Sequence, residues 1–169
     1  MIKFRWYYDK DKEERFLNDL ASKGYAMTRF FLGIYWFEKC NPGEYTYKID
    51  LIRDKSTEQK NEFYDLVRES GGELVQTWGP WAFFRKRGQF ELYSDTESQI
   101  EQYNRIQKTF ITLAFCEGVI MPSQFISYLN YRKTFSLITT ILISAIFIIF
   151  CFQVYNCRRK IIDLKELNK

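Results

Sequence analysis

The feature that most constrains this chain is a stretch of 23 residues without a charge, residues 134–156. A helix needs about 20 mostly apolar residues to cross the hydrocarbon core of a bilayer. Basic residues flank the stretch on both sides, at positions 132–133 and 158–160. This pattern is typical of a transmembrane helix, so we predict a span over residues 134–156 and a lipid bilayer as a partner.

A second apolar stretch, residues 109–129, is less clear because it contains polar residues, Glu117 among them. A carboxylate at the middle of a bilayer costs about 2.5–3.5 kcal/mol on insertion scales. As an antiparallel partner of residues 134–156, the stretch would bring its polar groups level with those of the second span, where they can bond to one another. The polar side chains so paired are Glu117, Ser123, Gln124, Thr139, Thr140 and Ser144. We favour this helical hairpin, turning near residue 131, over a first segment that lies at the membrane interface.

Glu117 is a candidate functional residue, because ionisable groups inside a bilayer are expensive and usually have a role. It could take part in a proton-linked process or pair with a basic residue in a partner's span. It could equally be a protonated carboxyl that bonds to Ser144 or a neighbour. The sequence leaves both interpretations open.

The positive charges predict the orientation of the hairpin. Two spans place Arg105, Lys108 and the basic tail, residues 157–169, on one side, and only Arg132 and Lys133 on the other. We therefore expect an inner (cell) membrane protein whose N-terminal domain, residues 1–93, and tail are cytoplasmic, with residues 94–108 as a connecting helix. The four cysteines form no CxxC pair, which favours a reducing compartment. The first residues have no apolar h-region, so we expect no cleavable signal peptide.

Charge and composition disfavour several functions. Residues 1–108 carry 18 basic and 18 acidic residues, so we expect no nucleic-acid partner. The absence of histidine excludes imidazole-based zinc sites and Ser-His or Cys-His nucleophiles. Carboxylates such as Asp9, Glu44 and Asp50 have ordinary cap, turn and strand positions. We therefore predict no catalytic residue, no metal site and no cofactor, and a carboxylate-based hydrolase or transferase is the least supported class.

The first 93 residues predict an α+β domain with an internal repeat. Alternating apolar residues indicate strands at 2–8 and 45–51, each followed by a helix, at 11–23 and 56–70, and by two further strands. Ser56 with Gln59, and later Ser94 with Glu97, match the capping box that opens a helix. Five residues of the first half, Phe16, Leu20, Gly24, Met27 and Phe31, align at constant offset with Phe63, Val67, Gly71, Leu74 and Trp78. Beyond them the alignment skips one residue, so that Gly33 matches Gly79 and Phe37 matches Phe83. We predict tandem βαββ modules in a ferredoxin-like or GyrI-like arrangement.

Several blocks of the chain closely resemble a known family. The runs FRWYYDKDKEERFLNDLASKGY, NPGEYTYKIDL, WGPWAFFRK and FELYSDTESQIEQY are similar to domain-of-unknown-function family 2812. The resemblance covers residues 2–108 and implies a bacterial N-terminal domain of about a hundred residues followed by membrane helices. The family has no established activity. Its genes often lie near PadR-type repressors, which by association suggests a role in envelope or drug stress.

The domain is rich in aromatic residues on its predicted strands, which is the pattern most open to a functional interpretation. GyrI-like domains bind drugs in an aromatic groove between tandem βαββ modules. A similar groove here would suit a hydrophobic or cationic small molecule, through stacking and a carboxylate. The candidate ligand-binding residues are Tyr35, Trp36, Glu38, Trp78, Trp81 and Phe83. Alternatively, these rings fill the core.

Besides the least supported class, an enzyme, two functions therefore remain in consideration. The first is a membrane-anchored, non-enzymatic cytoplasmic module that binds another protein or has a regulatory role, with its hairpin docked against a membrane-protein partner. The second is a sensor that binds a hydrophobic or cationic compound through the aromatic groove.

Overall fold

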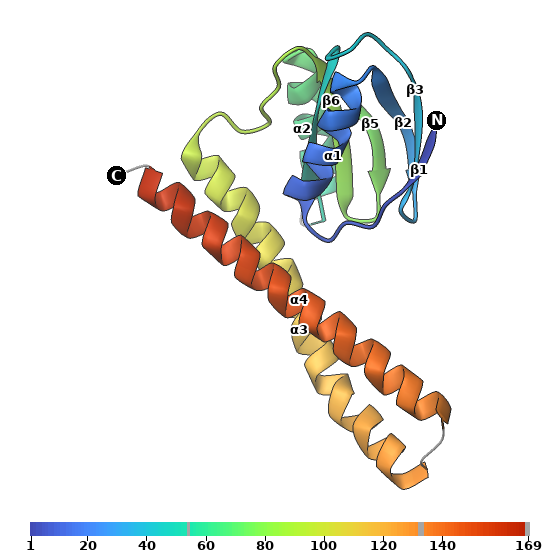
Figure 1. The fold of residues 1–169 in the computed structure, drawn as a ribbon. Helices are drawn as coiled ribbons and strands as arrows, with labels where there is room; N and C mark the ends of the chain where they lie inside the picture. Colours follow the sequence, from blue (N-terminus) through green and yellow to red (C-terminus); the bar gives the residue numbers. More distant parts are fainter. Residues whose placement is uncertain (54, 132–133, 168–169) are drawn as a thin grey trace. The chain divides into compact units, whose positions relative to one another are not determined.

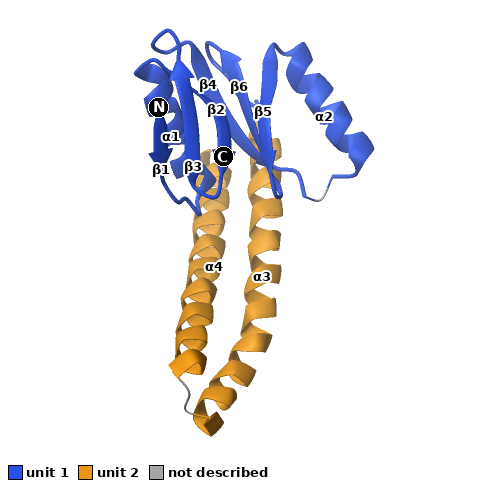
Figure 2. Ribbon diagram, turned by 90° about the vertical axis from the view of Figure 1, so that its right-hand side faces the viewer, with its two compact units in different colours: residues 1–94 blue, residues 95–169 orange. Residues whose placement is uncertain are grey.

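The computed structural model describes residues 1–53, 55–131 and 134–167 and divides into two compact units. The first unit, Met1–Ser94, is an α+β domain that we call the head. The second, Asp95–Lys169, consists of two long helices and is called the helical pair. Figures 1 and 2 show the elements of each unit.

The head contains the predicted tandem βαββ repeat. Its first module is β1 (Ile2–Phe4), α1 (Lys10–Ser22), β2 (Tyr25–Phe31) and β3 (Ile34–Lys39). The second is β4 (Tyr45–Leu51), α2 (Thr57–Glu69), β5 (Gly72–Trp78) and β6 (Trp81–Arg87). Each module forms an antiparallel three-stranded sheet, in the orders β1-β3-β2 and β4-β6-β5. The α+β class and the element order are thus confirmed, although β1 ends at Phe4 instead of residue 8.

The helices begin at residues whose side chains bind free backbone N–H groups. Asp9 caps α1 by accepting a hydrogen bond from the Asp11 N–H at 2.9 Å, and Ser56 and Gln59 form the predicted capping box of α2. At the start of the next helix, Asp95 Oδ1 accepts from the Ser98 N–H at 2.7 Å. The prediction that Ser94 caps this helix was therefore wrong by one residue. A carboxylate at this position also interacts favourably with the helix dipole.

The two modules superimpose with a single offset of 47 residues. The pair Ile2↔Trp36 corresponds to Ile49↔Phe83, and a β-bulge interrupts both hairpins at equivalent places, between Met27 and Arg29 and between Leu74 and Gln76. The skipped residue in the predicted alignment was therefore wrong. That alignment matched Gly33 with Gly79, but these glycines occupy different positions of two-residue turns, Leu32-Gly33 and Gly79-Pro80.

The corrected offset shows that the modules are covered differently. The main core lies between the two sheets and α1, which packs against both β2 and β4. Its buried residues are Leu17, Leu20, Ala21, Met27, Phe30, Tyr35, Phe37, Tyr47, Ile49 and Phe83. A second cluster, around Val67, Ala82 and Phe84, fills the space between the β4-β6-β5 sheet and α2. Since Phe83 and Phe84 point to opposite faces of β6, this sheet is covered on both faces.

Side-chain hydrogen bonds join the two modules. The Gln76 amide bonds to both backbone groups of Phe30: its Nε2 donates to the carbonyl at 2.7 Å, and its Oε1 accepts from the N–H at 2.8 Å. The Tyr47 hydroxyl accepts from the Met27 N–H at 2.8 Å. These bonds satisfy backbone groups at the edge of β2, which would otherwise lack partners beside β5.

The helical pair consists of α3 (Thr96–Tyr131) and α4 (Thr134–Leu167), which lie antiparallel and side by side (Figure 1). Both are long and apolar enough to cross a membrane. The predicted connecting helix and the first apolar segment form a single helix, α3, with Pro122 inside it. The second helix extends beyond the predicted span, to Leu167. The turn was predicted near residue 131, and α3 ends at Tyr131; residues 132–133 and the last two tail residues lie outside the described residues.

Candidate functional sites

The β1-β3-β2 sheet has an apolar face that points away from the main core. Residues directly opposite each other in an antiparallel pair share a face, and the register pairs Ile2 with Trp36, and Ile34 with both Phe4 and Phe31. We call these five residues the open face. The side chains of Ile2 and Phe4 are 62% and 64% exposed, and Phe31 is also exposed. Large exposed apolar patches are uncommon on soluble domains and are frequent at sites of contact with proteins, membranes or ligands.

The open face continues onto the segment after β1. A Cβ atom at Gly33 would lie 3.1 and 3.2 Å from the rings of Trp6 and Phe4, so both rings rest against the β2–β3 turn. Trp6 is itself exposed, and its ring lies 6.3 Å from that of Tyr8. The Arg29 guanidinium lies over the Trp36 ring at 5.4 Å. The surface is therefore apolar and aromatic, with the exposed cation Arg29 at its rim.

The same positions are buried in the second module. Ile49 and Phe83, which correspond to Ile2 and Trp36, are 1% and 2% exposed. They belong to the main core, together with Leu17, Leu20 and Ala21 of α1. The open face is thus the one sheet face, among the residues described, that the repeat covers in one module and leaves bare in the other.

The structure divides the predicted ligand-binding residues between two faces of the sheets. Tyr35 and Phe83 are buried in the main core, and Trp78 and Trp81 pack against it. Trp36 lies on the open face, and Glu38 is exposed two residues further along β3. The edge of the Trp78 ring system also meets Phe31, at 4.9 Å between centroids. Four of the six residues therefore contribute to packing, as the alternative interpretation expects.

Two acidic side chains of α1, the partly buried Glu13 and the buried Glu14, form a site that the sequence did not predict. The Tyr35 hydroxyl donates a hydrogen bond to Glu13 Oε1 at 2.5 Å. Burial raises the pKa of Glu13 to about 7, because the charged carboxylate loses solvation, and the neighbouring Glu14 adds to the increase. Burial also raises the pKa of Glu14, whose Oε1 accepts from the Ile49 N–H at 2.9 Å. The only hint in the sequence is that Glu14 shares a helical face with Leu17 and Ala21.

A second feature of the head is a basic cleft of about 370 Å³ at the end of β6. Its lining residues are Tyr45, Arg68, Gly71, Gly72, Glu73, Arg85, Lys86 and Arg87. Arg85 pairs with Glu73 and lies over the Tyr45 ring at 4.5 Å, while Arg87 pairs with Glu44 at 3.1 Å. These arginines already have carboxylate partners, so the cleft has a structural explanation. In the described residues, no group of three or more His, Cys, Asp or Glu side chains is placed to hold a metal ion.

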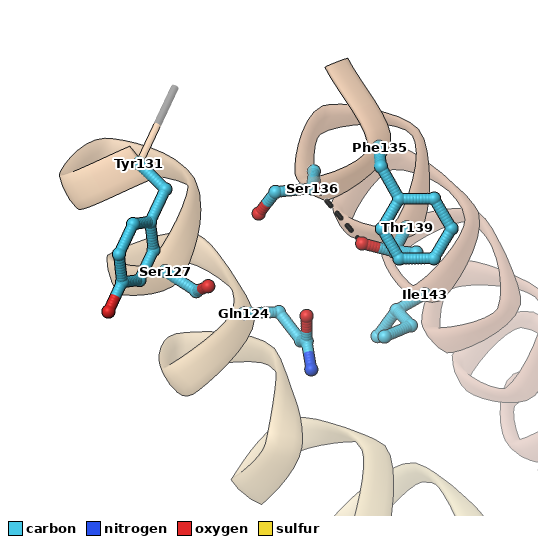
Figure 3. A pocket seen from close by; sticks show the side chains of 7 residues that line it. All are labelled: Gln124, Ser127, Tyr131, Phe135, Ser136, Thr139 and Ile143. Carbon is cyan, nitrogen blue, oxygen red and sulfur yellow. Dashed lines mark hydrogen bonds between the residues drawn. The ribbon is translucent and has the colours of Figure 1, made fainter. Parts of the chain in front are cut away.

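The helical pair contains a polar recess of about 420 Å³ near its loop end (Figure 3). It is lined by Gln124, Ser127, Tyr131, Phe135, Ser136, Thr139 and Ile143. The Gln124 side chain points toward α4 in Figure 3. Ser136 Oγ is buried and has no hydrogen-bond partner among the described residues. The recess is thus a small polar region between two otherwise apolar helices.

Two contacts show which levels of α3 and α4 meet. Thr140 Oγ1 approaches the Gln124 backbone carbonyl across the pair at 3.4 Å, and Gly118, next to Glu117, faces Phe147. The hydroxyls nevertheless bond mainly within their own helices, since Ser123 donates to the Ile120 carbonyl and Ser144 to the Thr140 carbonyl. Local bonds of this kind satisfy hydroxyls inside a membrane helix without a partner helix.

Fold and sites together define a protein of two parts: an α+β head with an uncovered apolar sheet face, and two helices that could span a membrane. Residues 9–115, more than half of the chain, match the family model described as "Protein of unknown function (DUF2812)". The chain belongs to this family, which confirms the resemblance seen in the sequence. No curated protein and no solved structure matched the chain.

Proposed function

We propose that the protein is a membrane-anchored, non-enzymatic interaction module whose head binds another protein through the open face. The observation that carries this proposal is the contrast between equivalent positions, Ile2 exposed and Ile49 buried. Leaving these apolar side chains in water has no structural benefit for the head alone, and burial in an interface would stabilise the complex by about 25 cal/mol per Å² of apolar surface. We further propose, by association with the family resemblance alone, that this binding belongs to a regulatory response to envelope or drug stress.

The proposed location is the inner membrane, with the head in the cytoplasm. The support is the distribution of basic residues: Arg158, Arg159 and Lys160 follow the second apolar stretch on the side of the chain that also carries Arg105 and Lys108. The helices anchor the head close to the bilayer, so that a membrane-protein partner would meet it at a high local concentration.

The orientation can be tested through Cys40, which is partly accessible in the head. We expect a thiol reagent that cannot cross membranes to leave Cys40 unlabelled in intact cells and to label it after the membrane is permeabilised. A Cys40→Ser variant is the control, because labelling of Cys116 or Cys151 would persist in it. Labelling of Cys40 in intact cells would place the head on the outer side and contradict the proposed location.

The protein contact can be tested by photocrosslinking in living cells. We expect benzoylphenylalanine in place of Phe4 or Phe31 to crosslink the full chain to one specific protein, because both side chains lie on the open face. The matched control is the same substitution at Leu66 on α2, whose side chain is 64% exposed, as is that of Phe4. Equal crosslinking from Leu66, or none from the open face, would contradict the proposed function.

The sensor of small molecules is the alternative function, and the geometry supports it less. Of the six predicted residues, only Trp36 and Glu38 lie outside the main core or its packing layer. The Arg29 guanidinium already lies over the Trp36 ring, which disfavours the approach of a second cation. We therefore place protein binding first.

A further inference from the structure

The way in which the sheet of the second module is covered shows which kind of element fits the open face of the first module. In that module, Leu17, Leu20 and Ala21 of α1, which packs against β4, belong to the same buried cluster as Ile49 and Phe83. Phe30 of the β1-β3-β2 sheet completes this cover, with its ring 5.4 Å from that of Phe83. The three residues of α1 lie at helix positions i, i+3 and i+4, which form one stripe along a helix. The face is thus complementary to an amphipathic helix.

The same helix also satisfies the free edge of the sheet. The outer strand of that sheet is β4, so some of its backbone groups have no strand partner. Glu14 Oε1 accepts from the Ile49 N–H at 2.9 Å. Asn18 accepts from the Tyr47 N–H at 2.7 Å and donates to the Tyr47 carbonyl at 3.1 Å. A carboxylate and an amide one turn apart therefore fix the helix along the strand edge.

The first module offers the same face and the same edge without a helix. β1 is the outer strand of its sheet, and Ile2 occupies the position of Ile49. Bonds to β3 and its turn come from the neighbouring residues, since the Met1 carbonyl accepts from Phe37 and the Arg5 N–H donates to Gly33. Strand alternation then directs the Ile2 backbone groups away from β3. Both the apolar contacts and the edge groups of an α1-type site are present there.

We propose that the open face binds an amphipathic α-helix of the partner protein, packed on this sheet as α1 packs on the β4-β6-β5 sheet. This inference rests on the proposed function and specifies its partner. The pattern of α1 gives the expected helix: a carboxylate or amide at position i, as Glu14, and apolar residues at i+3, i+6 and i+7, as Leu17, Leu20 and Ala21. The exposed cation Arg29, whose guanidinium lies over the Trp36 ring of the open face, favours a further acidic residue at the flank of this helix.

A second copy of this chain fits the face less well than a separate helix. In a head-to-tail stack of heads, α2 of one copy would occupy the site of α1. The α2 residues that correspond to Glu14, Asn18 and Ala21, by the 47-residue offset, are Asn61, Asp65 and Arg68, which are all exposed. Arg68 is also paired with Asp65 at 2.9 Å. At the position of Ala21, the small apolar residue with which α1 meets the sheet, α2 has the guanidinium of Arg68.

The experiment uses the full chain in cells, with benzoylphenylalanine at position 2, 4 or 31. Mass spectrometry then identifies which residues of the partner are crosslinked. We expect them to be separated by three, four or seven positions, because a helix presents one stripe to the face. In membranes from the same cells, a synthetic peptide of residues 9–24 should reduce the crosslink by about tenfold at saturation, because it carries the α1 pattern. The same peptide with Leu17→Ser and Leu20→Ser is the control and should leave the crosslink intact.

The outcomes distinguish a failure of the partner-helix proposal from a failure of the proposed protein-binding function. Crosslinks at every second residue of the partner would indicate an added strand, and would overturn the helix while leaving protein binding in place. Crosslinks to a second copy, to the helical pair or to lipid alone would overturn the partner helix and the proposed function together. Equal competition by the control peptide would overturn the α1-like mode of packing.

Discussion

Replacing Ile49 by alanine is expected to lower the free energy of unfolding of the head by about 2–5 kcal/mol, the range for large-to-small changes in a core. The equivalent change in the first module, Ile2→Ala, should cost less than about 0.5 kcal/mol, as is usual at exposed positions. The two residues are of the same type and occupy the same position of the repeat, but they are 1% and 62% exposed. The difference therefore measures the cover that α1 and the core-facing residues of the β1-β3-β2 sheet provide to the face of the second module.

This comparison can be made on the full chain in detergent micelles. Urea unfolding followed by tryptophan fluorescence reports on the head, because the four tryptophans of the chain, Trp6, Trp36, Trp78 and Trp81, all lie within it. Neither variant removes one of them. Similar losses of stability in both variants would show that the open face is covered in the isolated protein. That result would remove the basis for a partner at this surface.

Much of the fold could be predicted because its signals are local. Alternation over a few residues indicates a strand, and the residues Asp9, Ser56 and Gln59 carry the capping groups that begin α1 and α2. The 23 uncharged residues at 134–156 indicate a membrane helix from length and composition alone. Such patterns need no knowledge of what packs against them.

The covering of each face could not be predicted, because it depends on contacts between modules. Ile2 and Ile49 have the same local pattern, and the packing of the first module against the second, with α1 beside β4, makes Ile49 a core residue. The wrong skip in the repeat hid this relation, since it matched Phe37 with Phe83. The pairing register matches Phe37 with Phe84 and Trp36 with Phe83. A shift of one residue in the alignment of the repeat therefore exchanges the two faces of a strand.

The candidate sites differ in the same way. Trp36 and Phe83 were predicted to line one groove, but the repeat places the first on the open face and the second in the core. The environment of Glu13 was not predicted, because a glutamate in a charged turn of a helix is expected to be exposed to solvent. Its hydrogen-bond partner, Tyr35, lies 22 residues further along the chain. Such a long-range contact leaves no pattern around position 13.

The stability of the head is expected to fall by about 3 kcal/mol as the pH rises from below 4.5 to above 7, because of Glu13. The pKa of this residue is raised from its ordinary value of 4.5 to about 7 in the folded head. Below pH 4.5 the group is protonated in both states, and the hydrogen bond with Tyr35 joins two neutral partners. Between the two values the unfolded chain releases the proton and the folded head retains it, so that ionisation favours unfolding. Above pH 7 the full cost of a buried charge is present.

The variant that tests this expectation is Glu13→Gln, whose amide oxygen can still accept the Tyr35 hydroxyl but cannot ionise. Urea unfolding of the full chain in detergent, at several pH values from 4 to 8, should show a much weaker dependence on pH in this variant. A smaller slope should persist, since burial also raises the pKa of Glu14. Glu62→Gln on the exposed side of α2 is the control and should behave as the unmodified chain does. If Glu13→Gln kept the full dependence on pH, the carboxyl would be ionised in the folded head at neutral pH. The Tyr35 hydroxyl would then donate to a carboxylate that water still reaches.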